Sequence, residues 1–176
     1  NMADARKMAD CFLMMRSHPR PVIAAVHGRA LAGGCGIATA CDIILAAESA
    51  QFGYPEVNIG FVPAMVMAIL RRSISEKAAL ELVVSGEVIS ASRAHEIGLV
   101  HRVYSDDQFT DGVNTYAAKL AAKSASAVML SKKLLYNMDS MSFEAALESG
   151  VEINAIARMT EDCRRGVARF LSKGKS

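Results

Sequence analysis

The chain has 176 residues, of which 52% are apolar and 22% charged, and its formal net charge is +2. This length and composition are typical of one globular domain with a sizeable core. We expect neither nucleic acid nor a membrane among its partners, because the charge is nearly balanced, no apolar run reaches membrane-spanning length and no secretory leader opens the sequence.

The cysteines and histidines show no pattern of a metal or redox site. The four cysteines, Cys11, Cys35, Cys41 and Cys163, form no C-x-x-C pair, and the histidines lack metal-ligand spacing. We therefore expect no metal site and buried free thiols. Free thiols are typical of a reducing compartment, so the predicted location is cytoplasmic.

The first half of the chain alternates helical patterns with short apolar runs. Apolar residues at i, i+3 and i+4 intervals predict a helix over residues 2–16. This helix should end before Pro19, because a residue that precedes proline avoids the helical conformation. Strands are predicted at three apolar runs, residues 22–26, 43–46 and 100–104. Helices are predicted to begin near Ala32, Pro63, Ser75 and the N-cap Ser90, and Gly98 ends the last of them.

The second half is predicted to be almost wholly helical from Asp106 onward, with Ser142 and Thr160 as helix caps. Strands separated by helices indicate an α/β core. We therefore expect an α/β core over residues 1–105, followed by a helical section over residues 106–176.

Glycines crowd the stretch "HGRALAGGCGIATACD", residues 27–42, where a predicted strand turns into a predicted helix. Turns of this kind often bind an anion at backbone N–H groups. Two phosphate-binding motifs fail, because Gly34 and Cys35 replace the P-loop lysine and hydroxyl residue, and Thr39 replaces the third glycine of G-x-G-x-x-G. The N–H groups near Gly33 and Gly34 suit one developing negative charge, such as an enolate oxygen. The alternative is a tight strand–helix contact that tolerates only small side chains.

A second candidate is Glu56, in "QFGYPEVNIGFVPAM", residues 51–65. Its apolar neighbours predict a desolvated carboxylate with a raised pKa, which suits proton transfer near neutral pH. These neighbours are Tyr54, Val57, Ile59, Phe61 and Val62. The alternative is an ordinary surface glutamate.

Together the two stretches resemble the enoyl-CoA hydratase/isomerase (crotonase) superfamily. The family pattern P-V-I-A-A-V-x-G-x-A-x-G-G-G-C, then F-G-x-P-E-x-x-x-G-x-x-P, is similar to "RPVIAAVHGRALAGGCGIATACD" and "FGYPEVNIGFVP" here. The resemblance continues through "SGEVISASRAHEIGLVHRV" into "EDCRRGVARFLSKGKS". It implies a spiral core of strands and helices, and a C-terminal helical section that forms trimers or dimers of trimers.

The resemblance also implies roles for single residues. The N–H of Gly33 is expected to be one of two donors to the thioester oxygen of an acyl-CoA, with Gly34 beside it, and Glu56 falls on the catalytic glutamate of the "PE" motif. The backbone N–H of Ala64 falls on a position that helps hold the catalytic water. Phe170 and Lys173 match positions that touch the nucleotide part of CoA. The alternative for that pair is a core aromatic and a solvated lysine.

Three departures from the family pattern matter. Gly36 stands where many hydratases carry a second glutamate that orients the water, whereas several isomerases of the family manage with one. Ala32 replaces the first glycine of the triplet and is expected to leave the Gly33 N–H free. No alanine–glycine–x–aspartate stretch supplies the second oxyanion donor. This predicts either that the chain is a fragment or that the sequence omits its first part.

The resemblance implies an acyl-CoA enzyme of fatty acid metabolism that stabilises an enolate-like transition state. Hydration of a 2-enoyl-CoA is the first hypothesis, and isomerisation of a 3-enoyl to a 2-enoyl thioester, favoured by Gly36, is the second. A non-catalytic acyl-CoA-binding subunit is the hypothesis from another class. No cofactor is expected, because coenzyme A is part of the substrate. A homotrimer or hexamer is expected, with the apolar residues Val151, Ile153, Ile156 and Ala157 at subunit contacts or in the core.

Overall fold

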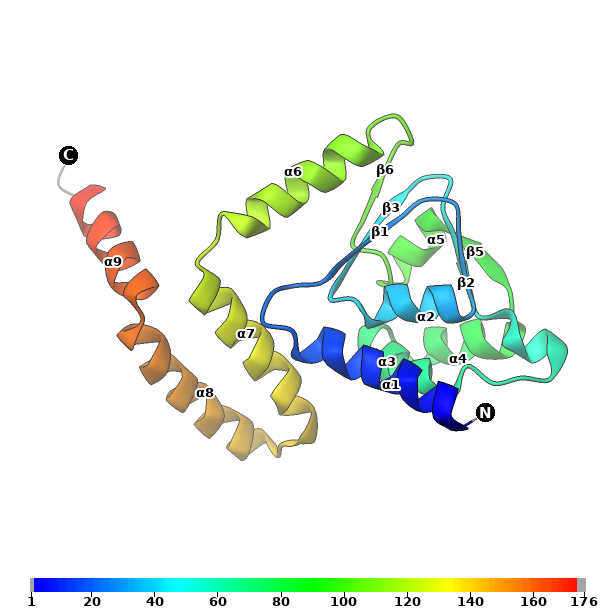
Figure 1. Ribbon diagram of the computed structural model, residues 1–176, viewed down its shortest axis with the longest axis horizontal. Helices are drawn as coiled ribbons and strands as arrows, with labels where there is room; N and C mark the ends of the chain where they lie inside the picture. Colours follow the sequence, from blue (N-terminus) through cyan, green and yellow to red (C-terminus); the bar gives the residue numbers. More distant parts are fainter. Residues whose placement is uncertain (1, 174–176) are drawn as a thin grey trace. The chain divides into compact units, whose positions relative to one another are not determined.

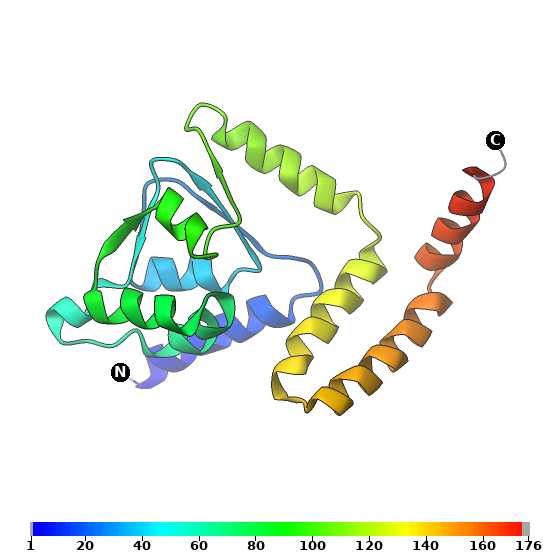
Figure 2. The same ribbon diagram turned by 180° about the vertical axis from the view of Figure 1, so that it is seen from behind.

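The computed structural model describes residues 2–173 and is shown in Figure 1 and, from behind, in Figure 2. The described residues form two compact units, one of residues 2–16 and 22–117, the other of residues 17–21 and 118–173. The units divide within helix α6 (Phe109–Ala121). The domain boundary expected after residue 105 stays a prediction.

Two three-stranded sheets form the centre of the first unit. The first sheet has the order β1-β3-β6, all parallel, with β1 at Ile23–Val26, β3 at Ile43–Ala47 and β6 at Arg102–Tyr104. These are the three predicted strands. The second sheet, which sequence reasoning missed, has β4 (Gln51–Gly53) parallel to β2 (Arg29–Leu31) and antiparallel to β5 (Val88–Ser90).

The chain turns twice from the first sheet into the second, which gives the core its spiral path. The first corner lies between β1 and β2, where Gly28 has a φ of 70°. The second lies between β3 and β4, where the Ala50 N–H donates to the Ala47 carbonyl at 3.0 Å. The N–H of Gln51 donates to the Gly28 carbonyl at 2.8 Å, so the two corners are joined directly. The expected spiral core of strands and helices is confirmed.

Helices cover the sheets of the first unit, and most begin where the sequence predicts. The bounds are α1 Met2–Ser17, α2 Gly33–Ala40, α3 Ala64–Ser73, α4 Glu76–Ser85 and α5 Ala91–Glu96. Ser75 and Ser90 are N-caps, since their side chains accept hydrogen bonds from the N–H groups of Ala78 and Arg93. The 3-10 helix η1 (Pro55–Ile59) was not predicted. Helix α1 lies beside α2 in both views, and its Phe12 is buried in the core against Gly36.

His101, in the segment between α5 and β6, bonds to β3 of the first sheet through both its backbone and its side chain. Its N–H donates to the Ile44 carbonyl at 2.9 Å, and its Nδ1 accepts from the Ile44 N–H at 3.0 Å. Burial lowers the pKa of His101, and the nearby His95 lowers it further. The folded protein therefore favours neutral His101, whose unprotonated Nδ1 is the acceptor.

We expect this histidine to make stability depend on pH. Because the folded pKa lies below the ordinary value of 6.5, the unfolded chain binds more protons at a pH just below 6.5. The free energy of unfolding should therefore fall as pH drops through about 6.5 and stop falling, for this group, below the folded pKa. Urea denaturation between about pH 5 and pH 8 measures this slope. It should shrink in His101→Gln and persist in the matched control His27→Gln; an unchanged slope in His101→Gln would contradict the assignment.

The second unit is built from three helices and a short 3-10 turn among its described residues. Helix α7 (Ala125–Asn137) is followed by η2 (Met138–Ser140), and α8 (Phe143–Met159) runs back along α7 (Figure 1). Helix α9 (Glu161–Lys173) follows. The predicted caps are confirmed, because Ser142 Oγ accepts from the Ala145 N–H and Thr160 Oγ1 from the Cys163 N–H, each at 3.2 Å.

Asp162 joins the beginnings of α9 and α7. Its carboxylate accepts hydrogen bonds from Ser124 Oγ at 2.7 Å and Ser126 Oγ at 2.9 Å, and pairs with Arg165 at 2.7 Å. These interactions, that of Ser124 foremost, lower the pKa of Asp162, so the carboxylate stays charged well below neutral pH. Sequence reasoning missed this cluster because Ser124 and Asp162 are 38 residues apart.

Within residues 2–173 the four cysteine thiols are not in disulfides, but only Cys35 is fully buried; Cys11, Cys41 and Cys163 are half-buried. The expectation of buried thiols is therefore wrong for those three, which lie on helices or turns with one side open. Within residues 2–173, no helix is long and apolar enough to cross a membrane, and no three His, Cys, Asp or Glu side chains gather to hold a metal ion.

Candidate active site

The glycine-rich turn places the beginning of α2 immediately after β2. The residue between them, Ala32, has φ 49° and ψ −124°, a backbone conformation that favours glycine. Two backbone hydrogen bonds of 2.9 Å hold it, one from its N–H to the Gly53 carbonyl and one to its carbonyl from the Gly36 N–H. The predicted strand-to-helix turn is present, and its geometry depends on β4.

Gly33 and Gly34 are exposed at the beginning of α2. The first N–H groups of a helix lack partners within the helix, and no acceptor from the described residues binds the N–H of either glycine. With the positive end of the helix dipole behind them, these groups suit one developing negative charge. With Ala32 before it, the Gly33 N–H has no acceptor in the described part of the chain.

We expect Ala32→Gly to stabilise the protein. A non-glycine residue in such a conformation costs about 1–3 kcal/mol, whereas the added freedom of glycine in the unfolded chain costs roughly 0.5–1 kcal/mol. The free energy of unfolding should therefore rise by about 1 kcal/mol, as measured by urea denaturation. The matched control is Ala38→Gly in α2, which should lower the free energy of unfolding. A loss of stability in Ala32→Gly would show that Ala32 is not strained.

Glu56 lies in η1, which Pro55 begins, and its carbonyl accepts a 2.9 Å hydrogen bond from the Phe61 N–H. The residue as a whole is half-buried, but its Oε2 is fully buried and has no hydrogen-bond partner among the described residues. A buried carboxylate oxygen without a partner is costly, so such groups in native proteins call for an explanation. The acid–base role expected for Glu56 stays a prediction.

The apolar enclosure expected around Glu56 is only partly present. Tyr54 is fully buried, but Val57, Ile59, Phe61 and Val62 are exposed, Ile59 to 85%. The tight η1 turn and the left-handed Gly60 (φ 74°) direct these four residues outward. The buried face of Glu56 is therefore formed by other residues.

Cys35, Thr39 and Tyr54 form a buried polar cluster next to Glu56. Tyr54 Oη lies 2.6 Å from Thr39 Oγ1, and the buried Cys35 thiol is close enough to both side chains to affect its pKa. Burial raises the pKa of Cys35 and of Tyr54, and the charge of Glu56 raises both further. Both groups are therefore neutral at pH 7, which excludes Cys35 as a thiolate nucleophile. Sequence reasoning missed Thr39 and Tyr54; the i, i+4 spacing of Cys35 and Thr39 was the available signal.

Gly36 is buried with its missing side chain facing α1 and α3. A Cβ atom there would lie 3.5 Å from Phe12 Cζ and 3.7 Å from Val66 Cβ, which is ordinary contact. The position therefore faces apolar atoms.

The enoyl-CoA hydratase/isomerase family model matches residues 3–176. The chain belongs to this family. Among its relatives, the 2,3-dehydroadipyl-CoA hydratase of Escherichia coli is 34% identical over 160 residues, which are 90% of this chain and 63% of the relative. The crystal structure of an enoyl-CoA hydratase from Mycobacterium smegmatis superposes with a TM-score of 0.92 at 32% identity, over 98% of this chain and 68% of that one. The crystal structure of human enoyl-CoA hydratase domain-containing protein 3 superposes with a TM-score of 0.90 at 30% identity, over 96% of this chain and 66% of that one.

The chain spans less than two thirds of the length of the curated relatives it matches, from 55% to 64%. The family membership is established for residues 3–176, and the fold for the part of that range that the structure describes.

Ala64, the family position for holding water, begins α3 at the surface. Its N–H donates to the Val62 carbonyl at 2.8 Å across Pro63, whose φ of −75° and ψ of 58° form an inverse γ-turn. This N–H already has an acceptor and would have to release it to bind a water. The role of Ala64 stays a prediction.

Phe170 and Lys173 belong to α9 in the second unit, whereas Gly33, Gly34 and Glu56 belong to the first. Phe170 is 79% exposed, which argues against the alternative of a core aromatic. The side chain of Lys173 lies outside the described part of the structure. The contact of this pair with CoA also stays a prediction.

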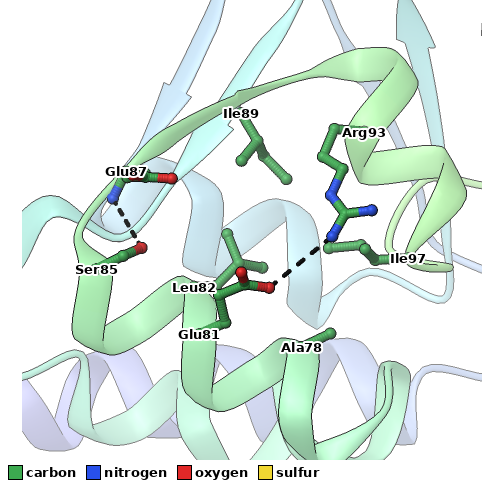
Figure 3. A pocket seen from close by; sticks show the side chains of 8 residues that line it. All are labelled: Ala78, Glu81, Leu82, Ser85, Glu87, Ile89, Arg93 and Ile97. Atoms are coloured by element: carbon green, nitrogen blue, oxygen red, sulfur yellow. Dashed lines mark hydrogen bonds and ion pairs between the residues drawn. The ribbon is translucent and has the colours of Figure 1, made fainter.

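A separate shallow pocket lies between α4, β5 and α5 and contains none of the predicted site residues (Figure 3). Arg93 is the one cationic side chain among the described lining residues of this pocket. It pairs with Glu81 at 3.9 Å and with Glu96 at 3.2 Å. The positive charge is thus compensated within the protein, and we assign no part of the reaction to this pocket.

Proposed function

We propose that this protein is an acyl-CoA enzyme and that it adds water to a 2-enoyl-CoA. The observation that carries this proposal is the buried Oε2 of Glu56, which has no hydrogen-bond partner in the described part of the chain. The open N–H end of α2 is held in the same unit by the bond from Ala32 to Gly53. An acid–base group and an oxyanion site are the two components that this reaction needs.

In the proposed reaction, the N–H groups of Gly33 and Gly34 stabilise negative charge on the thioester oxygen. Glu56 removes a proton from water, the resulting hydroxide oxygen bonds to the β-carbon, and the double-bond electrons move to the thioester oxygen. The enolate then collapses, and the α-carbon takes the proton from Glu56. Water is added overall and no cofactor besides the CoA ester is consumed. The name of the Escherichia coli relative, 2,3-dehydroadipyl-CoA hydratase, supports hydration.

Isomerisation of a 3-enoyl-CoA to a 2-enoyl-CoA is the second candidate, and Gly36 favours it. Gly36 brings no second carboxylate to orient water, and its surroundings, Phe12 and Val66, are apolar. In this reaction Glu56 would remove a proton from the α-carbon and return it to the γ-carbon.

Incubation with crotonyl-CoA and, separately, with 3-hexenoyl-CoA tests both proposals. Loss of the conjugated thioester absorbance of crotonyl-CoA supports hydration, and gain of that absorbance from 3-hexenoyl-CoA supports isomerisation. Binding of either ester without turnover would instead support a non-catalytic acyl-CoA-binding subunit and would overturn both reactions.

We also propose a homotrimer or hexamer assembled through α8 and α9. Of the apolar residues expected at subunit contacts, Val151 is 64% and Ile156 48% exposed, whereas Ile153 and Ala157 are half-buried. Large exposed apolar side chains on these helices support the proposal. Light scattering that shows a stable monomer would contradict the assembly.

The location that we propose is cytoplasmic, which the absence of disulfides among the described cysteines supports.

A further inference from the structure

Buried side chains from the two segments of the proposed site meet inside the first unit. Tyr54 lies between β4 and η1, two residues before Glu56, and is 0% exposed. Thr39 lies on α2, the helix that presents the Gly33 N–H, and is 3% exposed. Their oxygens are 2.6 Å apart, a short hydrogen bond in the core.

This bond resists displacement. A buried hydroxyl that loses its partner cannot turn to water, so the full desolvation penalty would appear if the two segments moved apart. Hydrogen bonds in a low-dielectric core are also electrostatically stronger than those at the surface. Tyr54 is in addition the N-cap residue of η1. A shift of its side chain therefore shifts the start of the short helix that carries Glu56.

We propose that Tyr54 is a positioning residue whose bond to Thr39 fixes the Glu56 carboxylate relative to the N–H groups at the beginning of α2. The inference rests on the proposed function, because it assigns Tyr54 a role in that same site. The charge of Glu56 raises the pKa of both Tyr54 and Cys35. This places its carboxylate within electrostatic range of the cluster.

Three variants separate positioning from simple packing. Tyr54→Phe removes the hydroxyl and leaves Thr39 Oγ1 without that partner. Tyr54→Phe combined with Thr39→Val removes both polar ends while keeping the shapes, which restores stability where a hydrogen bond serves only packing. Tyr104→Phe is the matched control, because it makes the same chemical change in a strand outside the cluster.

The readouts are the Tm, the steady-state kcat and KM on the preferred ester, and the carbon-13 resonance of the Glu56 side-chain carboxyl, assigned by its loss in Glu56→Gln. We expect Tyr54→Phe to lower the Tm, to reduce kcat roughly 10- to 100-fold with KM within about twofold, and to move the carboxyl resonance. The double variant should recover the Tm but keep the low kcat and the moved resonance. Tyr104→Phe should leave kcat and the resonance unchanged.

Two results would overturn the inference: a Glu56 resonance that stays in place in Tyr54→Phe, or a kcat that recovers together with the Tm in the double variant. If the unmodified protein turns over neither ester, the proposed function fails instead. The carboxyl resonance then still decides whether Tyr54 positions Glu56.

Discussion

Glu56→Gln should abolish most turnover while leaving binding of the CoA ester nearly intact. Glutamine keeps the size of the side chain but cannot accept and return a proton, and loss of a positioned acid–base group costs roughly 10²–10⁴ in rate. The affected atom is Oε2, which is buried without a hydrogen-bond partner among residues 2–173. Measurement of kcat on the preferred ester, with calorimetric titration of a saturated acyl-CoA, separates catalysis from binding.

A matched control is Glu87→Gln, which makes the same change at an exposed glutamate of the shallow pocket. It should keep normal turnover. Near-normal turnover in Glu56→Gln would mean that Glu56 is not the catalyst and that the mechanism is wrong. A stability gain in Glu56→Gln would agree with the mechanism, because it would show that the carboxylate is kept at a cost in folding free energy.

Gly53→Ala should strongly destabilise the first unit. A Cβ atom at Gly53 would lie 2.8 Å from the Glu87 carbonyl oxygen and 3.3 Å from Val88 Cα, and both are backbone atoms of the paired segment. Backbone cannot move aside as a flexible side chain can, so we expect a loss of about 2–3 kcal/mol in the free energy of unfolding. Urea denaturation measures it.

Gly53→Ala should also reduce turnover more than its stability loss explains, because the Gly53 carbonyl accepts the hydrogen bond from Ala32. Gly150→Ala in α8 is the control, since an added Cβ there meets no described atom within 4 Å apart from the nearby backbone of its own helix. That helical substitution should be stabilising, by up to about 1 kcal/mol. If Gly53→Ala proves as stable as the unmodified protein, the tight approach of β4 to β5 is not as described.

The features predicted correctly from the sequence are those set by local chemistry. The caps Ser75, Ser90 and Ser142 each depend on residues within four positions. The turn at Gly33 is marked in the sequence by its local glycines, although the Gly53 carbonyl of β4 completes its geometry. The strands of the first sheet were visible because each is a run of apolar residues. Such signals are present in any short window of the sequence.

The missed features depend on contacts between distant residues. Strands β2 and β4 are three residues long and begin with Arg29 and Gln51, too short and too polar for a periodic signal. The contact between Thr39 and Tyr54 crosses from helix to strand end. The prediction of an apolar enclosure around Glu56 was wrong in part because η1 is a 3-10 helix, whose tighter turn changes which neighbours face inward.

The hydrogen bond between Ala32 and Gly53 has a consequence for refolding experiments. The hydrogen bonds within helix α2 are local, but its first turn takes this conformation only when β4 has paired with β2, and parallel pairing closes a long loop. Recovery of circular dichroism would therefore report that helices have returned, without reporting a competent oxyanion site. Recovery of CoA-ester binding in the same time course would report the non-local strand pairing. The rate at which CoA-ester binding recovers would therefore measure how fast the non-local pairing of β2 and β4 forms.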